Sequence, residues 1–170
     1  CSGLVGSEMC IRDRISIVLG GGNFIRGSSF SNGVVDRVTS DYMGMLGTVI
    51  NSLALQSNLK KIGVESRVMT AISINRVAEP YIKNKASNHH DKNRVVIFAS
   101  GTGNPFFSTD TAAVLRASEM KSDVIFKGTK VDGIYDKDPI KNSDAQKISE
   151  ISYSDYLSKD IKVMDATAIS

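Results

Sequence analysis

Residues 93–117, NRVVIFASGTGNPFFSTDTAAVLRA, contain the stretch that decides the fold. Their apolar run, residues 95–99, is rich in β-branched side chains and too short for an ordinary helix, which is typical of a strand buried on both faces in a parallel sheet. Gly101 and Gly103 follow among hydroxyl and amide side chains, and capping residues then precede a helix predicted over 112–120. Glycines bring backbone N–H groups close to an anion, so the stretch predicts a nucleotide or anion site at the end of the strand. A plain strand-to-helix connection, plugged by two phenylalanines, is the alternative.

A second strand followed by glycines lies at residues 15–27, ISIVLGGGNFIRG. Residues 15–19 predict the strand, residues 20–22 offer N–H groups, and Arg26 could bind a phosphate at two points. Ile25 stands where the dinucleotide fingerprint G-x-G-x-x-G needs its third glycine, so that fingerprint is absent. The sequence contains no G-x-x-x-x-G-K-[ST] loop either. Two strands that end in glycine loops favour a shared ligand site more strongly than one.

The remaining chain alternates between helical and strand patterns, which predicts an α/β fold. The expected elements are a long helix over 37–62, a strand over 64–70, a short helix over 77–84, a strand over 123–127, and a short strand and helix within 148–161.

Several polar residues are candidates for chemistry. Asp41 is expected in the first turn of the long helix, where a carboxylate either complements the helix dipole or accepts hydrogen bonds from a sugar diol. His89 and His90 have no third ligand at a metal-like spacing, so we expect exposed loop residues and not zinc ligands. The loop at 128–139 lacks the EF-hand pattern. Its hydroxyl, lysine, tyrosine and carboxylate groups suit a nucleotide, and a solvated turn is the alternative.

Composition excludes several classes of protein. The 170 residues are 41% hydrophobic, enough for a core, and the net charge of +3 comes from scattered basic residues, which disfavours nucleic acid as the main partner. No apolar run has the length of a membrane span, so no membrane partner is expected. Both cysteines, Cys1 and Cys10, precede residue 11, which leaves the remainder without a disulfide framework and fits a reducing cytoplasm.

Residues 1–14, CSGLVGSEMCIRDR, differ from the rest of the chain. They show no helical or strand period and no signal-peptide core, and they resemble translated adapter sequence. We therefore expect a non-native leader at 1–14 and a partial domain at 15–170, because the chain also stops within a predicted helix.

Five motifs, in this order and approximate spacing, resemble the bacterial uridylate kinases, a branch of the amino-acid-kinase family. They are GGGNFIRG (20–27), DYMGML (41–46), SGTGNPFFSTDTAA (100–113), KGTKVDGIYDKDP (127–139) and KVMD (162–165). The resemblance implies a three-layer α/β/α sandwich with a mostly parallel sheet, and transfer of the ATP γ-phosphoryl group to UMP with Mg²⁺, giving UDP and ADP for pyrimidine biosynthesis. It also implies a cytoplasmic homohexamer with GTP and UTP as possible effectors.

The resemblance assigns roles to individual residues as well. UMP would contact Gly21, Asp41, Thr102, Gly103, Asn104, Pro105, Phe106, Phe107, Ser108 and Thr109. ATP would contact Gly22, Arg26, Thr129, Tyr135 and Asp138. Arg26, Asp110 and Asp165 are the implied catalytic residues; the two carboxylates would organise the phosphates and their Mg²⁺, and no residue is predicted as a direct metal ligand. The UMP phosphate would attack directly, so catalysis would consist of in-line positioning and charge neutralisation.

The sequence departs from the family pattern at its ends. The family's first strand, with a lysine and a Ser-Gly turn that hold ATP phosphates, has no counterpart, and neither do the C-terminal strands; Ser108 replaces the usual threonine. We expect the chain by itself to be inactive. Two alternatives stay open: a kinase of the same fold that phosphorylates a carboxylate or carbamate, such as acetylglutamate or carbamate, and a non-catalytic nucleotide-binding regulatory domain.

Overall fold

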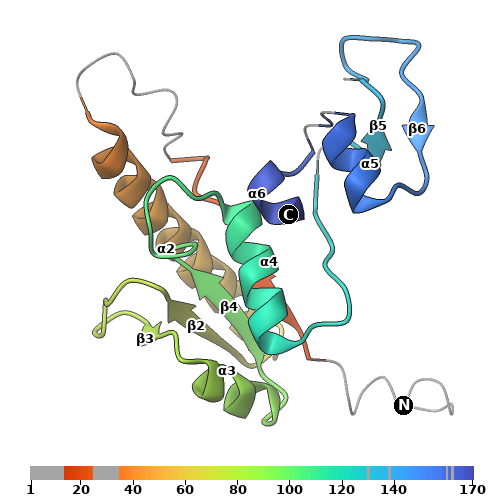
Figure 1. Cartoon of the computed structure of the whole chain (residues 1–170). Coiled ribbons are helices and arrows are strands. Elements are labelled where there is room, and N and C mark those ends of the chain that lie inside the picture. Colours follow the sequence, from red (N-terminus) through yellow and green to blue (C-terminus); the bar gives the residue numbers. More distant parts are fainter. Residues whose placement is uncertain (1–13, 25–34, 130, 138, 160, 162) are drawn as a thin grey trace, which may run out of the picture. The chain divides into compact units, whose positions relative to one another are not determined.

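The computed structural model of the chain describes residues 14–24, 35–129, 131–137, 139–159, 161 and 163–170 (Figure 1). The chain forms two compact units, of which the first ends at Thr109 and the second comprises Asp110–Ser170. In the described ranges, no helix combines the length and the apolar character needed to cross a membrane.

A parallel four-stranded sheet forms the centre of the first unit. Its strands are β1 (Ser16–Val18), β2 (Ser66–Thr70), β3 (Glu79–Pro80) and β4 (Val95–Ala99), in the spatial order β1-β4-β2-β3. The central strand β4 places Val96 opposite Ser16 of β1 and opposite Arg67 of β2. Val96 and Ile97 are both 0% exposed. The predictions of a buried strand at 95–99 and of a mostly parallel sheet are therefore confirmed.

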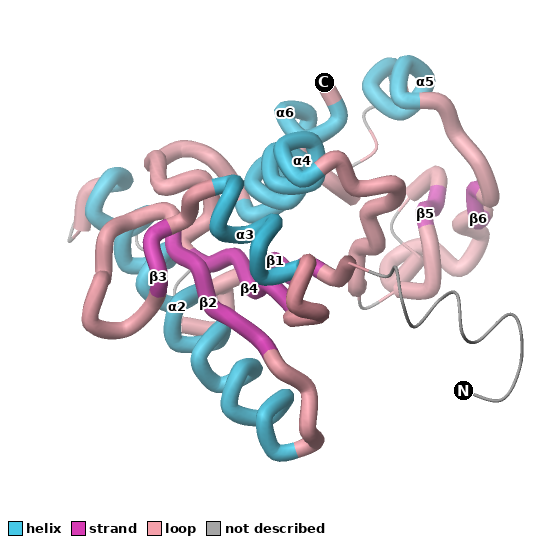
Figure 2. The backbone as a smooth tube through the Cα atoms, turned by 90° about the horizontal axis from the view of Figure 1, so that it is seen from below, coloured by secondary structure: helices cyan, strands magenta, loops and turns pink. Residues whose placement is uncertain are grey.

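Helices α2 (Arg37–Lys61) and α3 (Lys83–His90) cover the two faces of this sheet (Figure 2). Successive side chains of a strand point to opposite faces. Ile97 of β4 forms a buried cluster with Val49 of α2 and Val68 of β2. Phe98 points to the other face, where the Tyr81 ring meets it edge-on at a centroid distance of 5.3 Å and α3 packs against β4. The first unit thus has the three layers expected of an α/β/α sandwich.

The long helix α2 has clear start and stop signals. Asp36 is its N-cap: one carboxylate oxygen accepts the Thr39 N–H at 3.0 Å and the other accepts the Thr39 hydroxyl at 2.6 Å. These bonds lower the pKa of Asp36. Beyond Lys61, Gly63 adopts a φ of 80°, which lets the chain turn towards β2. The predicted helix is confirmed, but Asp41 lies in its second turn and not in the first.

Two predicted elements are wrong. Residues 123–127 form no strand, because no strand in the described part of the chain pairs with them; Phe126 is 88% exposed. The short helix expected over 77–84 begins later, at Lys83, because Glu79 and Pro80 pair with the end of β2 as the edge strand β3. Pro80 suits an edge position, where its missing N–H leaves no bond unmade.

The second unit contains α4 (Thr109–Met120, whose first residue closes the first unit), β5 (Ile134–Tyr135), β6 (Lys147–Ile148), α5 (Tyr153–Ser158) and α6 (Ala166–Ile169). Strands β5 and β6 form an antiparallel pair. The buried Tyr156 hydroxyl accepts N–H groups from Val163 and Met164 at 2.8 and 2.7 Å, and so fixes the connection from α5 to α6. The predicted helix at 112–120 and the helix within 148–161 are confirmed, and the strand expected there is β6, which begins one residue earlier, at Lys147.

Candidate functional site

The loop that follows β4 has a strained backbone. Ser100 and Phe106 adopt φ angles of 65° and 72°, in the left-handed region that disfavours residues with a side chain. Surrounding contacts must hold such residues in place, and residues strained in this way often occur at ligand sites. One contact is the hydrogen bond from the Ser100 N–H to Thr48 Oγ1 of α2, at 2.7 Å. The Ser100 side chain is buried, and its hydroxyl has no hydrogen-bond partner in the described residues.

Asp41 joins helix α2 to the same loop. Its Oδ2 accepts the Phe106 N–H at 2.8 Å, and both carboxylate oxygens lie 2.9 Å from Arg37 Nε. The Arg37 guanidinium also lies over the Phe106 ring, 5.7 Å from its centroid. A carboxylate has about four lone-pair positions, so Asp41 keeps capacity for a ligand hydroxyl. The structure therefore brings together Asp41 and Phe106, two predicted site residues that are 65 positions apart.

The glycine loop after β1 packs against the same helix. A Cβ atom on Gly21 would lie 2.3 Å from the carbonyl oxygen of Gly44 and 3.1 Å from the N atom of Thr48, so only glycine fits there. Asn51 donates a hydrogen bond to the Gly20 carbonyl at 2.7 Å. The backbone of Thr48 thus approaches Gly21 while its hydroxyl accepts a hydrogen bond from the loop after β4. Because β1 and β4 are parallel neighbours, both glycine loops lie at one edge of the sheet.

The rest of the predicted UMP loop is folded on itself. Thr102 Oγ1 accepts the Asn104 N–H at 3.2 Å, and the Gly103 N–H donates to the Ser100 carbonyl at 2.9 Å. A Cβ on Gly103, whose φ is 82°, would lie 3.1 Å from the Cβ of Ala71, so the loop contacts the segment after β2. Phe106 and Phe107 are 66% and 53% exposed, and Pro105, Ser108 and Thr109 are half-buried. The exposed rings do not form the plug that the alternative interpretation of this loop required.

Two predicted carboxylates are brought to one region of the second unit. Lys127 donates to Asp110 Oδ2 at 2.6 Å and to the carbonyl oxygen of Val163. The hydroxyls of Thr111 and Thr167 lie 2.8 Å apart. Asp165 is the exposed N-cap of α6 and lies in the sequence between Val163 and Thr167, which make these contacts. It therefore belongs to the same region as Asp110. Lys127 was not predicted as a site residue, since nothing in its local sequence indicates a contact with two distant segments.

The structure describes only some of the residues that were predicted to contact ATP. Gly22 is exposed in the turn after β1, and the Thr129 hydroxyl donates to the Val131 carbonyl. The Tyr135 hydroxyl donates to Asp132 at 2.7 Å. Arg26 and Asp138 lie outside the described residues, and their roles stay predictions.

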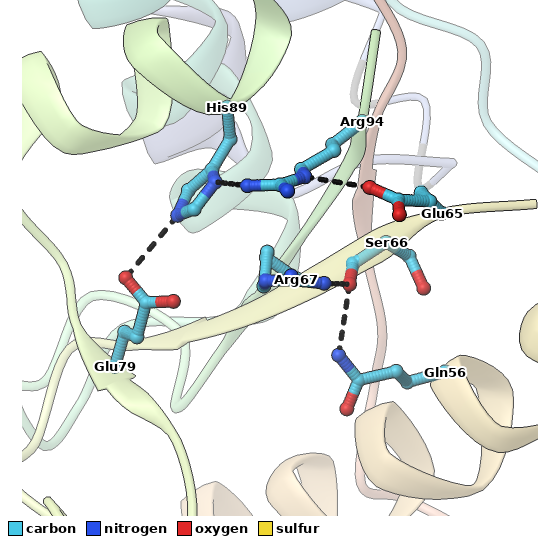
Figure 3. A network of polar contacts seen from close by, with 7 residues as sticks. All are labelled: Gln56, Glu65, Ser66, Arg67, Glu79, His89 and Arg94. Carbon is cyan, nitrogen blue, oxygen red and sulfur yellow. Dashed lines mark hydrogen bonds and ion pairs between the residues drawn. The ribbon is translucent and has the colours of Figure 1, made fainter. Parts of the chain in front are cut away.

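The histidines correct another prediction, since neither is an exposed loop residue. Both end helix α3, and His90 is 6% exposed, with Nε2 3.1 Å from the Ser16 hydroxyl. His89 lies between Glu79 and Arg94, at 3.2 and 3.4 Å (Figure 3). The later start of α3 explains the error, because it places both residues on a helix packed against the sheet. Within the described ranges, no group of three or more His, Cys, Asp or Glu residues could hold a metal ion.

Comparisons with known proteins agree with this architecture. Residues 6–170 match the sequence model of the amino acid kinase family. A uridylate kinase of Roseobacter denitrificans is 54% identical over 166 residues, which are 98% of this chain and 66% of that protein. The crystal structure of UMP kinase from Bacillus anthracis superimposes with a TM-score of 0.88 at 42% identity, over 97% of this chain and 68% of that one. The structure of UMP kinase from Ureaplasma parvum gives a TM-score of 0.88 at 40% identity, over 96% and 70%. The chain spans just under two thirds of the length of the Roseobacter protein.

Proposed function

The chain belongs to the amino acid kinase family, and on this premise we propose that it acts as a uridylate kinase, transferring the γ-phosphoryl group of ATP to UMP to give UDP and ADP. The names of the similar proteins support this choice of substrate. The observation that carries the proposal is the hydrogen bond from the Phe106 N–H to Asp41, which joins the two motifs of the acceptor site.

The acceptor site would recognise both ends of the nucleotide. Asp41 accepts hydrogen bonds from the ribose hydroxyls with the lone pairs that Arg37 and Phe106 leave free. The exposed rings of Phe106 and Phe107 offer apolar faces to the uracil base. We assign the backbone of Gly21, and the loop from Thr102 to Thr109, to contacts with UMP.

Residues of the second unit would help to neutralise the negative charge of the phosphates. Lys127 holds Asp110 and connects it to the segment that carries Asp165. We assign Asp110 and Asp165 to organising the phosphates and their Mg²⁺, the role that the resemblance gives them. When bound with ATP, Mg²⁺ supplies positive charge to the phosphates during transfer. We assign Arg26 to the same charge neutralisation, and Gly22, Thr129, Tyr135 and Asp138 to contacts with ATP.

The setting of the enzyme is proposed from the resemblance alone. It places the protein in the cytoplasm, as a homohexamer whose activity responds to GTP and UTP.

The proposal is tested by exchanging the matched segment of the Roseobacter uridylate kinase for this chain and measuring ADP formation with different acceptors. We expect ATP consumption that depends on UMP. The same chimera with Asp41→Asn should show a higher KM for UMP, while Asp36→Asn, which removes a charge at the helix N-cap and keeps a capping side chain, should leave that KM unchanged.

Two results would contradict the proposal. ATP consumption with acetylglutamate or carbamate, and none with UMP, would indicate a kinase of different specificity. Binding of UMP and ATP without turnover in the chimera would indicate a regulatory domain.

A further inference from the structure

In the second unit, Tyr135 belongs to a cluster that includes two residues without an assigned role, Asp132 and Lys147. The Tyr135 hydroxyl donates to Asp132 Oδ1 at 2.7 Å, and Lys147 Nζ donates to Oδ2 of the same carboxylate at 2.8 Å. Pairing of β5 with β6 sets Tyr135 directly opposite Lys147. Residues opposite each other in an antiparallel pair point to the same face, so both side chains reach one carboxylate.

The charges of this cluster are stable around neutral pH. Hydrogen bonds from Lys147 and Tyr135 lower the pKa of Asp132 to about 2. In turn, the hydrogen bond to Asp132 raises the pKa of Tyr135, and it raises that of Lys147 as well. The tyrosine hydroxyl is therefore protonated and engaged as a donor. Its proton is therefore not available to a ligand, whereas its ring can still stack on one.

Gly133 provides the space that Lys147 needs. A Cβ atom on Gly133 would lie 2.5 Å from Lys147 Cε and 3.4 Å from its Nζ. The φ of Gly133 is outside the left-handed region, so an alanine there causes no backbone strain. Its single effect is to push the flexible lysine away from Asp132.

We propose that Asp132, Gly133 and Lys147 form a clamp that holds the Tyr135 ring in position to stack on the base of the donor nucleotide. This inference rests on the proposed function, in which Tyr135 contacts ATP. A ring that is fixed before binding loses less conformational freedom when the base stacks on it. Lys147 also neutralises a carboxylate that would otherwise repel a triphosphate. Asp132 and Lys147 are positioning residues, and their effect is confined to the donor nucleotide.

The test compares ATP and UMP affinities of Lys147→Met and Gly133→Ala with those of the unchanged chain, by following backbone amide shifts during titration. Stacking of a base on an aromatic ring increases affinity by about five- to 150-fold. A ring that is held less firmly loses part of this gain, so each variant should bind ATP about three- to tenfold more weakly. UMP binding should stay the same. The double variant should be no weaker than the weaker single variant, because both changes break one contact. Lys121→Met is the matched control, since it removes an exposed lysine of the second unit that lies outside the loop at 128–139, and it should leave ATP binding unchanged.

A second measurement checks the clamp without any nucleotide. The pKa of the Asp132 carboxyl group, followed by carbon-13 NMR, should rise from about 2 towards its ordinary 3.8 in both Lys147→Met and Gly133→Ala. An unchanged pKa in Gly133→Ala would mean that Lys147 keeps its position, which overturns the clamp.

The remaining outcomes separate the inference from the proposed function. A raised Asp132 pKa with unchanged ATP affinity overturns the inference and leaves the function standing. Tyr135→Ala should weaken ATP binding more than either clamp variant does. If this variant binds ATP as tightly as the unchanged chain, Tyr135 does not contact ATP, and the inference is wrong as well. A chain that binds UMP but no ATP at millimolar concentration overturns the donor site and the clamp together.

Discussion

Asp41 Oδ2 accepts the backbone N–H of Phe106 at 2.8 Å, so a carboxylate of helix α2 holds a left-handed residue of the loop after β4. Arg37 completes this arrangement by binding Asp41 and lying over the Phe106 ring. The site therefore depends on a helix and a loop that are distant in sequence.

The first prediction concerns the acceptor sugar. If Asp41 accepts hydrogen bonds from the ribose, dUMP leaves this carboxylate poorly paired, at a cost of about 1–3 kcal/mol relative to UMP. We expect Asp41→Asn to narrow that difference, and Asp36→Asn to leave it unchanged. Calorimetric titration with both nucleotides measures it. Equal affinities for UMP and dUMP in the unchanged chain would show that Asp41 does not recognise the ribose.

The second prediction concerns the strain at Ser100. A left-handed φ costs a residue with a side chain about 1–2 kcal/mol, and glycine avoids this cost while losing about 0.5–1 kcal/mol through its more flexible unfolded chain. Ser100→Gly also removes a buried hydroxyl that lacks a partner among the described residues. We expect a gain of about 1 kcal/mol in the free energy of unfolding, measured by urea denaturation.

Asn93→Gly is the control for Ser100. Asn93 has a φ of 54°, but asparagine tolerates this region, and the residue is exposed. Its replacement should change stability by less than that of Ser100. A destabilised Ser100→Gly variant would mean that the serine side chain makes a favourable contact.

The third prediction concerns the approach of Gly21 to α2. In Gly21→Ala the new Cβ would lie 2.3 Å from the Gly44 carbonyl oxygen, and a backbone atom cannot move aside as a flexible side chain can. We expect a loss of at least about 2 kcal/mol in unfolding free energy. Gly44→Ala should instead stabilise the helix by about 0.5–1 kcal/mol, because nothing outside the helix lies within 4 Å of its Cβ position. Thermal unfolding of both variants tests this prediction. Equal stabilities of Gly21→Ala and Gly44→Ala would contradict the close packing of Gly21 against α2.

The fourth prediction concerns pH. Burial lowers the pKa of His90 below 6.5, so the folded state favours the neutral ring that contacts Ser16. The backbone of Ile15 and the charge of Asp91 oppose this shift, whereas the charges of Arg14 and His89 assist it. For a base with a lowered folded pKa, the stabilisation is complete above the unfolded pKa and is lost as pH falls through the folded pKa.

Urea denaturation between pH 8 and 5 measures this effect of His90. The unchanged chain should lose more stability below pH 6.5 than His90→Gln, which cannot titrate. Parallel pH profiles for the two proteins would mean that His90 has the same pKa in both states.

The sequence by itself determined the elements that depend on local patterns. The β-branched run of β4 and the helical period of α2 are local patterns, so the bounds of both elements were predicted nearly as observed. The positions of the two glycine loops could also be inferred, because parallel strands end at the same edge of a sheet. Arg37 could have been found as the partner of Asp41, since the two are four residues apart on a helix.

Only the tertiary structure decided the contacts made across the chain. Residues 123–127 have the composition of a strand, but a strand needs a neighbour for its backbone groups, and none of the described strands provides one. His90 is polar and was expected in solvent, yet the packing of α3 against β4 buries it beside Ser16. The hydrogen bond between Asp41 and Phe106 likewise has no local signal, because a backbone N–H becomes available to a distant carboxylate only when the loop has folded.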